Sequence, residues 1–329
     1  MIQFAKSSLF SLLTIGLSLP LAAQEHDLRI QATKGTTVWL KQHMVMSQTM
    51  EIAGQEMETA QDKTTVLQFT VKDVEADGTL VVETNVARIY GSMQMPMGMG
   101  DVEYDSAEAA ADKDDEAGGG FMPSPGQMGK MQTMLAGKKF LAKVKANGKV
   151  ASLEGVAELL KKPAGGRGGM PQAELSEDTL RHMVESAFGS VPEKPAAVGA
   201  TWDHRVEEGQ GMPAAAIKVT LAKVDSDAYE ISSTGTIEPP KPSKDAADER
   251  AAMLESLKIA NSKFTGTGRM SRTDGFVLAV KHMVEMDASM ESPMGGEMSM
   301  KVKSTNTIER TTAEAAAPKK AAAPADAPK

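Results

Sequence analysis

The chain has 329 residues, a formal net charge of −8 and no cysteine. The excess of acidic residues argues against a nucleic-acid-binding protein, which needs a basic face to displace counterions from phosphates. The lack of cysteine excludes disulfides, thiolate zinc sites and thiol nucleophiles. The length allows one or two domains. Methionine is the compositional anomaly, with 24 residues against 8 phenylalanines, 3 tyrosines and 2 tryptophans.

Residues 1–23 have the pattern of a secretory signal peptide. Lys6 supplies the positive charge, residues 9–19 form the apolar run, and Leu21-Ala22-Ala23 offers small residues at a cleavage site. We therefore expect export to the periplasm or the extracellular medium, with cleavage after Ala23. Retention of the segment as an N-terminal membrane anchor is the alternative. Later segments do not approach 18 consecutive apolar residues, so no membrane span is expected after signal removal.

Residues 24–162 are predicted to form a β-rich N-terminal half that closes with a helix. Residues 37–50 are rich in β-branched and apolar side chains, and residues 67–89 contain two apolar runs separated by a turn signal at Asp77-Gly78. These runs are typical of paired antiparallel strands, and Gly54 indicates an earlier hairpin.

Residues 106–120 interrupt this half with acids, alanines and glycines. Because such a segment has almost nothing to bury, we expect a disordered insertion. The acids do not follow the spacing of an EF-hand calcium loop, so a solvated charge run is favoured over a metal site.

Two short helices are predicted between the halves. Residues 153–162 (LEGVAELLKK) place apolar side chains on one side and lysines at the C-terminal end. Residues 176–188 begin with a serine cap and two acids, and continue with apolar residues at helical spacing. The glycine-rich stretch within residues 163–175 indicates a flexible linker.

The second β-rich half, within residues 176–312, shows signs of an internal repeat. Residues 69–84 align without gaps with residues 219–234, and the hairpin at Asn147-Gly148 resembles the one at Asp274-Gly275. Internal duplication is one interpretation, and chance similarity between two hairpin-rich sheets is the other.

Residues 313–329 consist almost entirely of alanine, proline and lysine. No core can form there, so a disordered tail is predicted. The predicted fold class is therefore α+β, mainly antiparallel β, with two β-rich halves and two short helices between them.

Several short elements follow one another in a recognisable order. They are Val102-Glu103-Tyr104-Asp105-Ser106, Asn147-Gly148-Lys149-Val150, Leu153-Glu154-Gly155, Pro192-Glu193-Lys194-Pro195, Gly199 and Trp202. Together with the signal segment and the methionine-rich opening strand, they resemble a family of secreted bacterial proteins of unknown function. The resemblance covers most of the chain after residue 30. It implies a fold and an export address, and no catalytic residues.

Catalytic motifs are not found in the sequence. The histidines are His26, His43, His182, His204 and His282, and they include no i, i+4 pair and no HExxH motif. A GxSxG nucleophile elbow and a phosphate-binding glycine loop are also missing. We therefore expect a protein without enzymatic activity and without a cofactor. An enzyme with no recognisable motif is kept as an alternative.

The methionines support two further interpretations. Met93, Met95, Met97 and Met99 alternate along one run, and two histidines stand beside methionines. These two groups are His43 with Met44 and Met46, and His282 with Met283 and Met286. Thioethers and imidazoles bind Cu(I), so a soft-metal site is one hypothesis. Methionine also fills cores and adaptable ligand surfaces, and we favour this apolar lining.

The preferred function is a binding or interaction module with a Met- and Val-lined interior. Its partner is a hydrophobic ligand or an envelope protein, and an open cavity would favour the ligand. Trp39 and Trp202 each follow a glycine at the start of a β-rich half. Because large aromatic residues are scarce here, we predict that both tryptophans anchor the core of their halves.

Overall fold

The structure is a computed structural model that describes residues 24–52, 54–94, 100–108, 125–160, 176–206, 214–238, 256–291 and 297–317. Most of this chain is β-strand. The strands are β1 (Glu25–His26), β2 (Thr37–Ile52), β3 (Gln55–Val74), β4 (Leu80–Gln94), β5 (Asp101–Asp105), β6 (Lys139–Val144), β7 (Val150–Glu154), β8 (Ala196–Ala197), β9 (Thr201–Val206), β10 (Ala215–Val224), β11 (Ala228–Ile237), β12 (Lys258–Ser271), β13 (Val277–Glu291) and β14 (Glu297–Thr311). The α-helices of the described ranges are α1 (Pro125–Thr133) and α2 (Glu177–Glu185). The predicted α+β fold, mainly antiparallel β, is confirmed.

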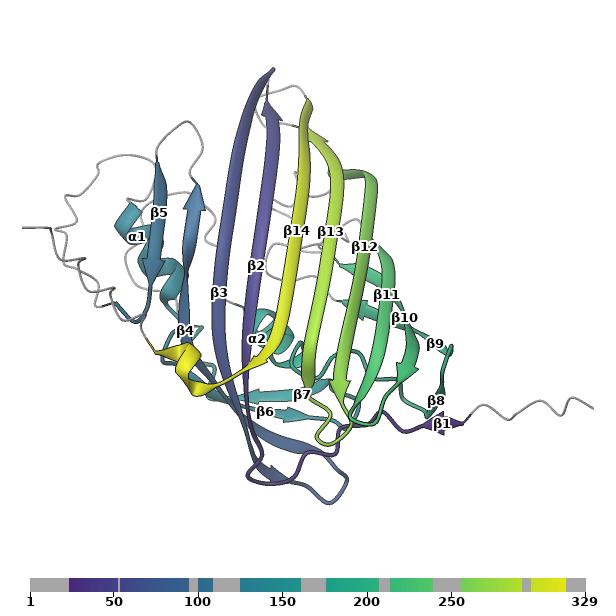
Figure 1. Ribbon diagram of the computed structural model, residues 1–329. Coiled ribbons are helices and arrows are strands. Elements are labelled where there is room, and N and C mark those ends of the chain that lie inside the picture. Colours follow the sequence, from purple (N-terminus) through teal and green to yellow (C-terminus); the bar gives the residue numbers. More distant parts are fainter. Residues whose placement is uncertain are drawn as a thin grey trace, which may run out of the picture.

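One antiparallel sheet of twelve strands runs through both halves of the chain (Figure 1). Its order is β7-β6-β4-β3-β2-β14-β13-β12-β11-β10-β9, and β5 pairs with β4 beside this path. Strand β14 pairs with β13 on one side and with β2 on the other, so the last strand of the chain joins the two halves. The two predicted β-rich halves are therefore parts of one continuous sheet. The strands β1 and β8 form a small sheet of their own.

The two faces of the large sheet differ in burial, as the alternation of side chains along strands requires. Strand β10 shows this clearly, because Ala215, Ile217, Val219 and Leu221 are buried and the residues between them are more exposed. We call the face that carries these buried residues the inner face and the opposite one the outer face. Figure 1 shows α2 behind the long strands, on the inner side.

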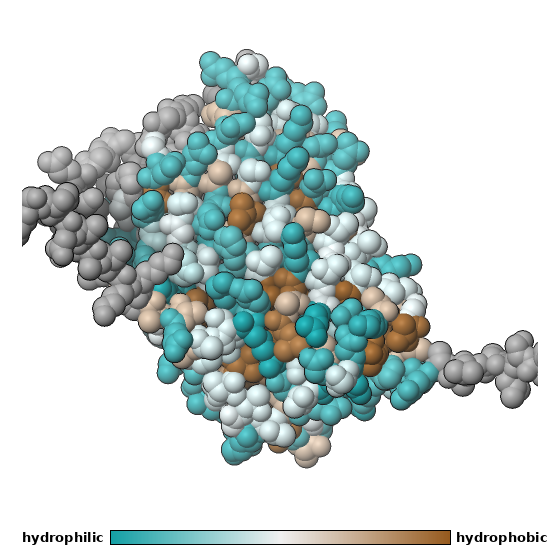
Figure 2. All heavy atoms as spheres, viewed as in Figure 1, coloured by the Kyte–Doolittle hydropathy of each residue, from teal (hydrophilic) through white to brown (hydrophobic). Residues whose placement is uncertain are grey.

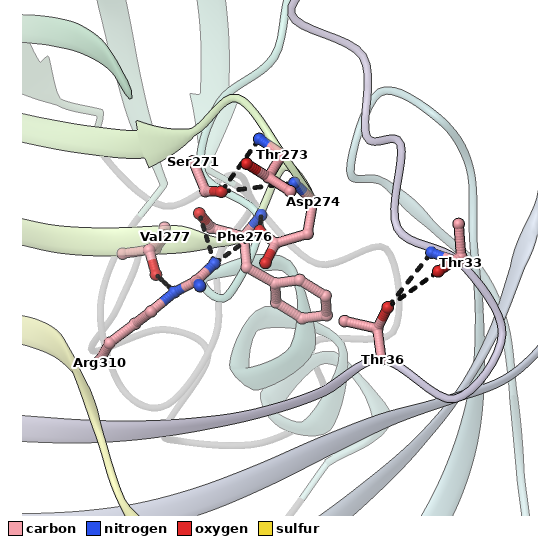
Figure 3. Close-up of polar contacts among 8 residues, drawn as sticks. All are labelled: Thr33, Thr36, Ser271, Thr273, Asp274, Phe276, Val277 and Arg310. Atoms are coloured by element: carbon pink, nitrogen blue, oxygen red, sulfur yellow. Dashed lines mark hydrogen bonds and ion pairs between the residues drawn. The ribbon is translucent and has the colours of Figure 1, made fainter. Parts of the chain in front are cut away.

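Two hydrophobic clusters fill the inner side, one for each half of the sheet. The first contains three fully buried phenylalanines, Phe69, Phe188 and Phe276, and the rings of Phe188 and Phe276 lie 4.5 Å apart. The turn before Phe276 is held by Arg310, whose guanidinium donates to Asp274 Oδ1 at 2.6 Å and to the carbonyl of Val277 at 3.2 Å (Figure 3). These hydrogen bonds connect β14, which carries Arg310, to the turn that precedes the buried Phe276.

The two halves share backbone details at the positions that the repeat aligns. Gly35 N–H donates to Val71 O and Gly199 N–H donates to Leu221 O, each at 2.8 Å. The register of the following hairpin shifts directly after Val71 in β3 and directly after Leu221 in β10. A bulge adds one residue to a strand and is a specific feature of a fold. Two bulges at aligned positions therefore support the interpretation of an internal duplication.

Of the two predicted helices, the one at residues 176–188 is present as α2 and the one at residues 153–162 is not. Helix α2 begins after Ser176, whose Oγ accepts from Thr179 N–H at 3.1 Å, and it buries Leu180 and Val184 completely. The predicted helix at residues 153–162 is wrong for its described part. Leu153 and Glu154 pair with β6, and Gly155 turns the chain at a φ of +78°, so one turn at residues 156–160 remains. Residues 161–175, including the predicted linker, lie outside the described residues.

Helix α1 was missed because its sequence, PGQMGKMQT, has two glycines and no clear apolar stripe. Tertiary contacts support it instead, since it packs beside β4 and β5. In the part of the chain that the structure covers, no helix is long and apolar enough to cross a lipid bilayer.

The predicted disordered segments are partly described. In the insertion, Ser106 N–H donates to Ile89 O at 2.9 Å, so residues 106–108 are an ordered turn, whereas residues 109–120 lie outside the described residues. In the tail, Ala313–Ala316 form a 3-10 turn, η2, and the carbonyl of Ala317 accepts from buried Arg88. The prediction of disorder from residue 313 is therefore wrong for the first five residues. Residues 318–329 lie outside the described residues.

Candidate ligand-binding face

Methionine side chains gather on the inner face of four long neighbouring strands, β3, β2, β14 and β13. Residues directly opposite each other in paired strands share a face, and residues two apart on one strand do so as well. One row of the sheet shows the arrangement, because Met46, Ser304, Val284 and Phe264 stand opposite one another across β2, β14, β13 and β12.

Eight methionines of these four strands lie on the inner face by the same register, and we call them the methionine face. They are Met44, Met46 and Met50 on β2, Met57 on β3, Met286 and Met290 on β13, and Met298 and Met300 on β14. Met286 and Met298 are buried and the other six are half-buried. Met300 Sδ also accepts a hydrogen bond from Gln48 Nε2 at 3.1 Å.

The outer face is different in character. Figure 2 shows it as mostly hydrophilic, with hydrophobic residues in scattered patches. Among its residues, Val45 and Met283 are exposed at 44% each. The contrast between the faces places the largest group of polarizable apolar side chains on the inner side.

A pocket of about 570 Å³ opens where β11 and β12 separate. It is lined by Thr236, Ile237, Leu257, Lys258, Ile259, Ala260, Asn261 and Ser262. Ile259 and Ser262 stand opposite Ala288 and Met286 in the sheet, so the pocket adjoins the methionine face. Its volume lies within the roughly 300–1,000 Å³ that is common for small-molecule sites.

Three half-buried side chains with ring N–H groups lie on the same face, and we call them the polar group. Trp202 and His204 are two residues apart on β9, and His282 lies in the row of Trp202 but four strands away, on β13. His282 is nevertheless close enough to His204 for the two rings to interact electrostatically. The ring of His282 covers Gly266, because a Cβ built on that glycine would lie 2.5 Å from the His282 Cδ2 atom. The same ring packs against Phe264 with centroids 5.1 Å apart.

Among the described residues, the indole of Trp202 has no hydrogen-bond partner, and both histidines have lowered pKa values. The Nε1 atom of Trp202 is buried and makes no hydrogen bond. Burial lowers the pKa of His204 to about 4, helped by the charges of Lys149 and His182. Burial likewise lowers the pKa of His282 to about 4, with a smaller contribution from His204. Both imidazoles are therefore neutral near pH 7.

Lys63 is the cation nearest to the methionine face. It stands opposite Met44 in the sheet, and its Nζ donates to Gln132 Oε1 of α1 at 3.3 Å. Burial lowers the pKa of this lysine.

The predicted copper ligands are divided between the two faces. Met44, Met46, His282 and Met286 lie on the inner face. His43 and Met283 lie on the outer face, where His43 Nε2 is 3.0 Å from Asp62 Oδ1. Neighbouring residues of a strand point to opposite sides, so the six cannot share one ion. The described residues contain no group of three His, Asp or Glu side chains that could hold a metal. Met95, Met97 and Met99 lie outside the described residues. Met93 is the last residue but one of β4 and stands opposite Gln61, on the inner face.

The two tryptophans also fall on different faces. Trp202 is half-buried on the inner face and packs against the second hydrophobic cluster. Trp39 is half-buried on the outer face and belongs to neither cluster. Trp39 follows Gly35 by four residues and Trp202 follows Gly199 by three, and a shift of one residue changes the face. The N-terminal core is built on phenylalanines instead.

His204 and Lys63 were not singled out by sequence reasoning. A signal for His204 was present, because the strand TWDHRV alternates and places Trp202, His204 and Val206 on one side. The burial of Lys63 depends on α1, which the sequence pattern did not show.

Two solved structures are similar to the chain at low identity. A structure described as "Lipid-protein interactions in lipovitellin" has a TM-score of 0.47 and 9% identity, and the match covers 89% of this chain and 27% of that one. The crystal structure of an outer membrane channel from Pseudomonas putida F1 has a TM-score of 0.26 and 6% identity, with 86% and 98% covered. The chain therefore spans about a quarter of the lipovitellin chain. No curated protein matches the sequence.

A family model supplies the classification. The family described as "Family of unknown function (DUF6263)" matches residues 77–277. This range is more than half of the chain, and it begins at the β3–β4 turn and ends at the start of β13. The match agrees with the resemblance seen in the short sequence elements. The chain belongs to the DUF6263 family of unknown function.

Proposed function

We propose that this protein is an exported, non-enzymatic binding protein that holds a flexible apolar ligand on its methionine face. The observation that carries the proposal is the convergence of eight methionines from four strands on one face of the sheet. Methionine has three rotatable bonds and a polarizable sulfur, so a surface built from it adapts to ligands of variable shape. An alkyl chain is such a ligand.

The surroundings of the methionine face support the same proposal. Six of its methionines are half-buried, in contrast to the fully buried phenylalanines of the first cluster. The neighbouring pocket is open and carries Ile237, Leu257 and Ile259 beside polar groups. A ligand site combines apolar walls with a few polar groups in this way. The proposal of export rests on the signal-like residues 1–23.

Cu(I) binding is the second candidate, and one observation favours it. Met44, Met46, Met286 and the neutral imidazole of His282 lie on the same face, and thioethers with imidazoles suit Cu(I). The outer-face pair His43 and Met283 has no part in this set.

The test is an NMR titration of protein labelled with ¹³C at the methionine methyl groups. We expect dodecanol to shift the resonances of Met50 and Met300 and to leave that of Met283 unchanged. The variant Met300→Gln should weaken dodecanol binding, whereas the matched control Met283→Gln, on the outer face, should bind like the wild type. Shifts produced by Cu(I) and not by dodecanol would replace the proposal with the metal alternative. Equal effects of the two glutamine substitutions would contradict both.

A further inference from the structure

The charges of the large sheet are distributed unevenly between its faces. The register places each aspartate and glutamate with a described side chain in its strands on the outer face. Examples are Asp62, Glu83, Asp203, Glu230, Glu285 and Glu309. The inner face carries the cations Lys63 and Arg310. Arg310 is engaged by Asp274 and by two carbonyls, so the inner face has no carboxylate of its own strands near the polar group.

The polar group adds hydrogen-bond donors to this acid-free face. The indole Nε1–H of Trp202 can only donate, and a neutral imidazole has one N–H and one bare nitrogen. In the described structure the buried Trp202 donor has no acceptor. The rings of His204 and His282 are half-buried on the same face. A buried donor without a partner is costly, and a bound acceptor removes that cost.

Charged and titratable side chains of other elements lie near the polar group. Lys149 lies in the turn between β6 and β7 and His182 lies on α2, and both are close enough to act on His204 electrostatically. His182 is in turn 3.9 Å from Glu185 of the same helix. On this face the described side chains of the strands include N–H groups and no carboxylate, and Lys149 lies nearby. This arrangement favours an anionic acceptor, since a charge-assisted hydrogen bond is about twice as strong as a neutral one.

We propose that the polar group of Trp202, His204 and His282 binds the carboxylate of an alkyl-chain acid, whose chain lies along the methionine face. The inference rests on the proposed function and names the ligand class for it. Trp202 and His204 are neighbours on one face of β9. Along β13, Val284 is the inner-face residue between His282 and Met286, and across the sheet Asn306 stands between His282 and Met44. The carboxylate accepts from the indole and the imidazoles at one end of the ligand.

The test compares three ligands with the same alkyl chain: dodecanoate, dodecanol and dodecyltrimethylammonium. Each is titrated calorimetrically into the mature protein near neutral pH, below its micelle concentration. We expect dodecanoate to bind about tenfold more tightly than dodecanol, because its hydrogen bonds are charge-assisted. The ammonium ligand should bind least. In the double variant His204→Phe/His282→Phe, dodecanoate should lose its advantage while dodecanol still binds.

The control is His43→Phe, which changes a histidine on the outer face of β2 and should keep the preference for dodecanoate. A second measurement uses the wild-type protein and does not depend on the folding of any variant. Dodecanoate should raise the pKa of the His204 and His282 rings above 4 in an imidazole NMR titration, because a nearby anion favours the charged form. Equal affinities for dodecanoate and dodecanol would overturn the carboxylate site and leave the apolar-ligand function standing. Failure of all three ligands to bind would overturn both.

Discussion

Gly266 shows how one missing side chain shapes the inner face. A Cβ at this position would lie 2.4 Å from Ser233 Oγ and 2.5 Å from His282 Cδ2. We therefore expect Gly266→Ala to lower the free energy of unfolding by about 1–3 kcal/mol, because the added methyl group overpacks the site. Gly129→Ala is the control. That glycine is in helix α1, its Cβ would lie 3.5 Å from Tyr104, and alanine favours the helix. Thermal melts of both variants test this, and equal effects would contradict the packing argument.

His204 and His282 link stability to pH. Their pKa values are about 4 in the folded chain, against an ordinary histidine value of 6.5, so the unfolded chain binds protons first as the pH falls. The stabilisation is complete above about pH 6.5 and is lost between pH 6.5 and pH 4, by up to about 1.4 kcal/mol per pH unit for each histidine. Denaturant titrations across this range should give a shallower slope for His282→Phe than for wild type. A slope unchanged by the substitution would show that the ring titrates normally.

At the level of single elements, α2 is stabilised at its start and in turn protects an edge of the sheet. Arg181 Nη1 donates to Val150 O at 2.6 Å, and Val150 N–H donates to Glu185 Oε1 at 2.9 Å. These contacts occupy backbone groups on the edge strand β7, which an exposed edge would offer to other chains. The helix therefore contributes to the integrity of the sheet as well as to the first hydrophobic cluster.

The cap of α2 gives a prediction at the same scale. Ser176→Ala removes the oxygen that accepts from Thr179 N–H, and we expect a loss of about 1 kcal/mol in the free energy of unfolding. Ser176→Asp should retain most of the stability, because its carboxylate accepts the same hydrogen bond and interacts favourably with the helix N-terminus. Chemical denaturation measures both variants. If alanine and aspartate were equivalent, the serine would have no capping role.

For the whole molecule, the pairing of β14 with β2 predicts cooperative unfolding of the two halves. Trp39 lies in the first half and Trp202 in the second, so the variants Trp202→Phe and Trp39→Phe each leave one fluorescent reporter. We expect each reporter to follow the same denaturant midpoint as circular dichroism of that same variant, since a continuous sheet cannot lose one half without breaking the ladder of the other. Two separate transitions within either variant would show that the halves unfold independently.

The sequence predicted turns and the helix cap correctly, because these depend on residues that are adjacent in the chain. The turns at Gly54, Asp77-Gly78 and Asn147-Gly148 contain glycines at φ of +78° to +84°, and Ser176 caps α2 as expected. The helix predicted at residues 153–162 is wrong because Leu153 pairs with β6. A helical pattern in the sequence cannot reveal this pairing. Helix α1 was missed for the converse reason, because its support comes from β4, β5 and Gln61 and not from its own periodicity.

By itself, the sequence determined the strand-rich fold class, the family resemblance, most hairpin turns and the capped helix, because these depend on residues that are near one another in the chain. Tertiary structure alone decided that one sheet spans both halves, since β14 and β2 are separated by most of the sequence. It also decided which methionines meet, because register assigns each side chain to a face and separated His43 from His282. The candidate site is therefore a product of long-range strand pairing.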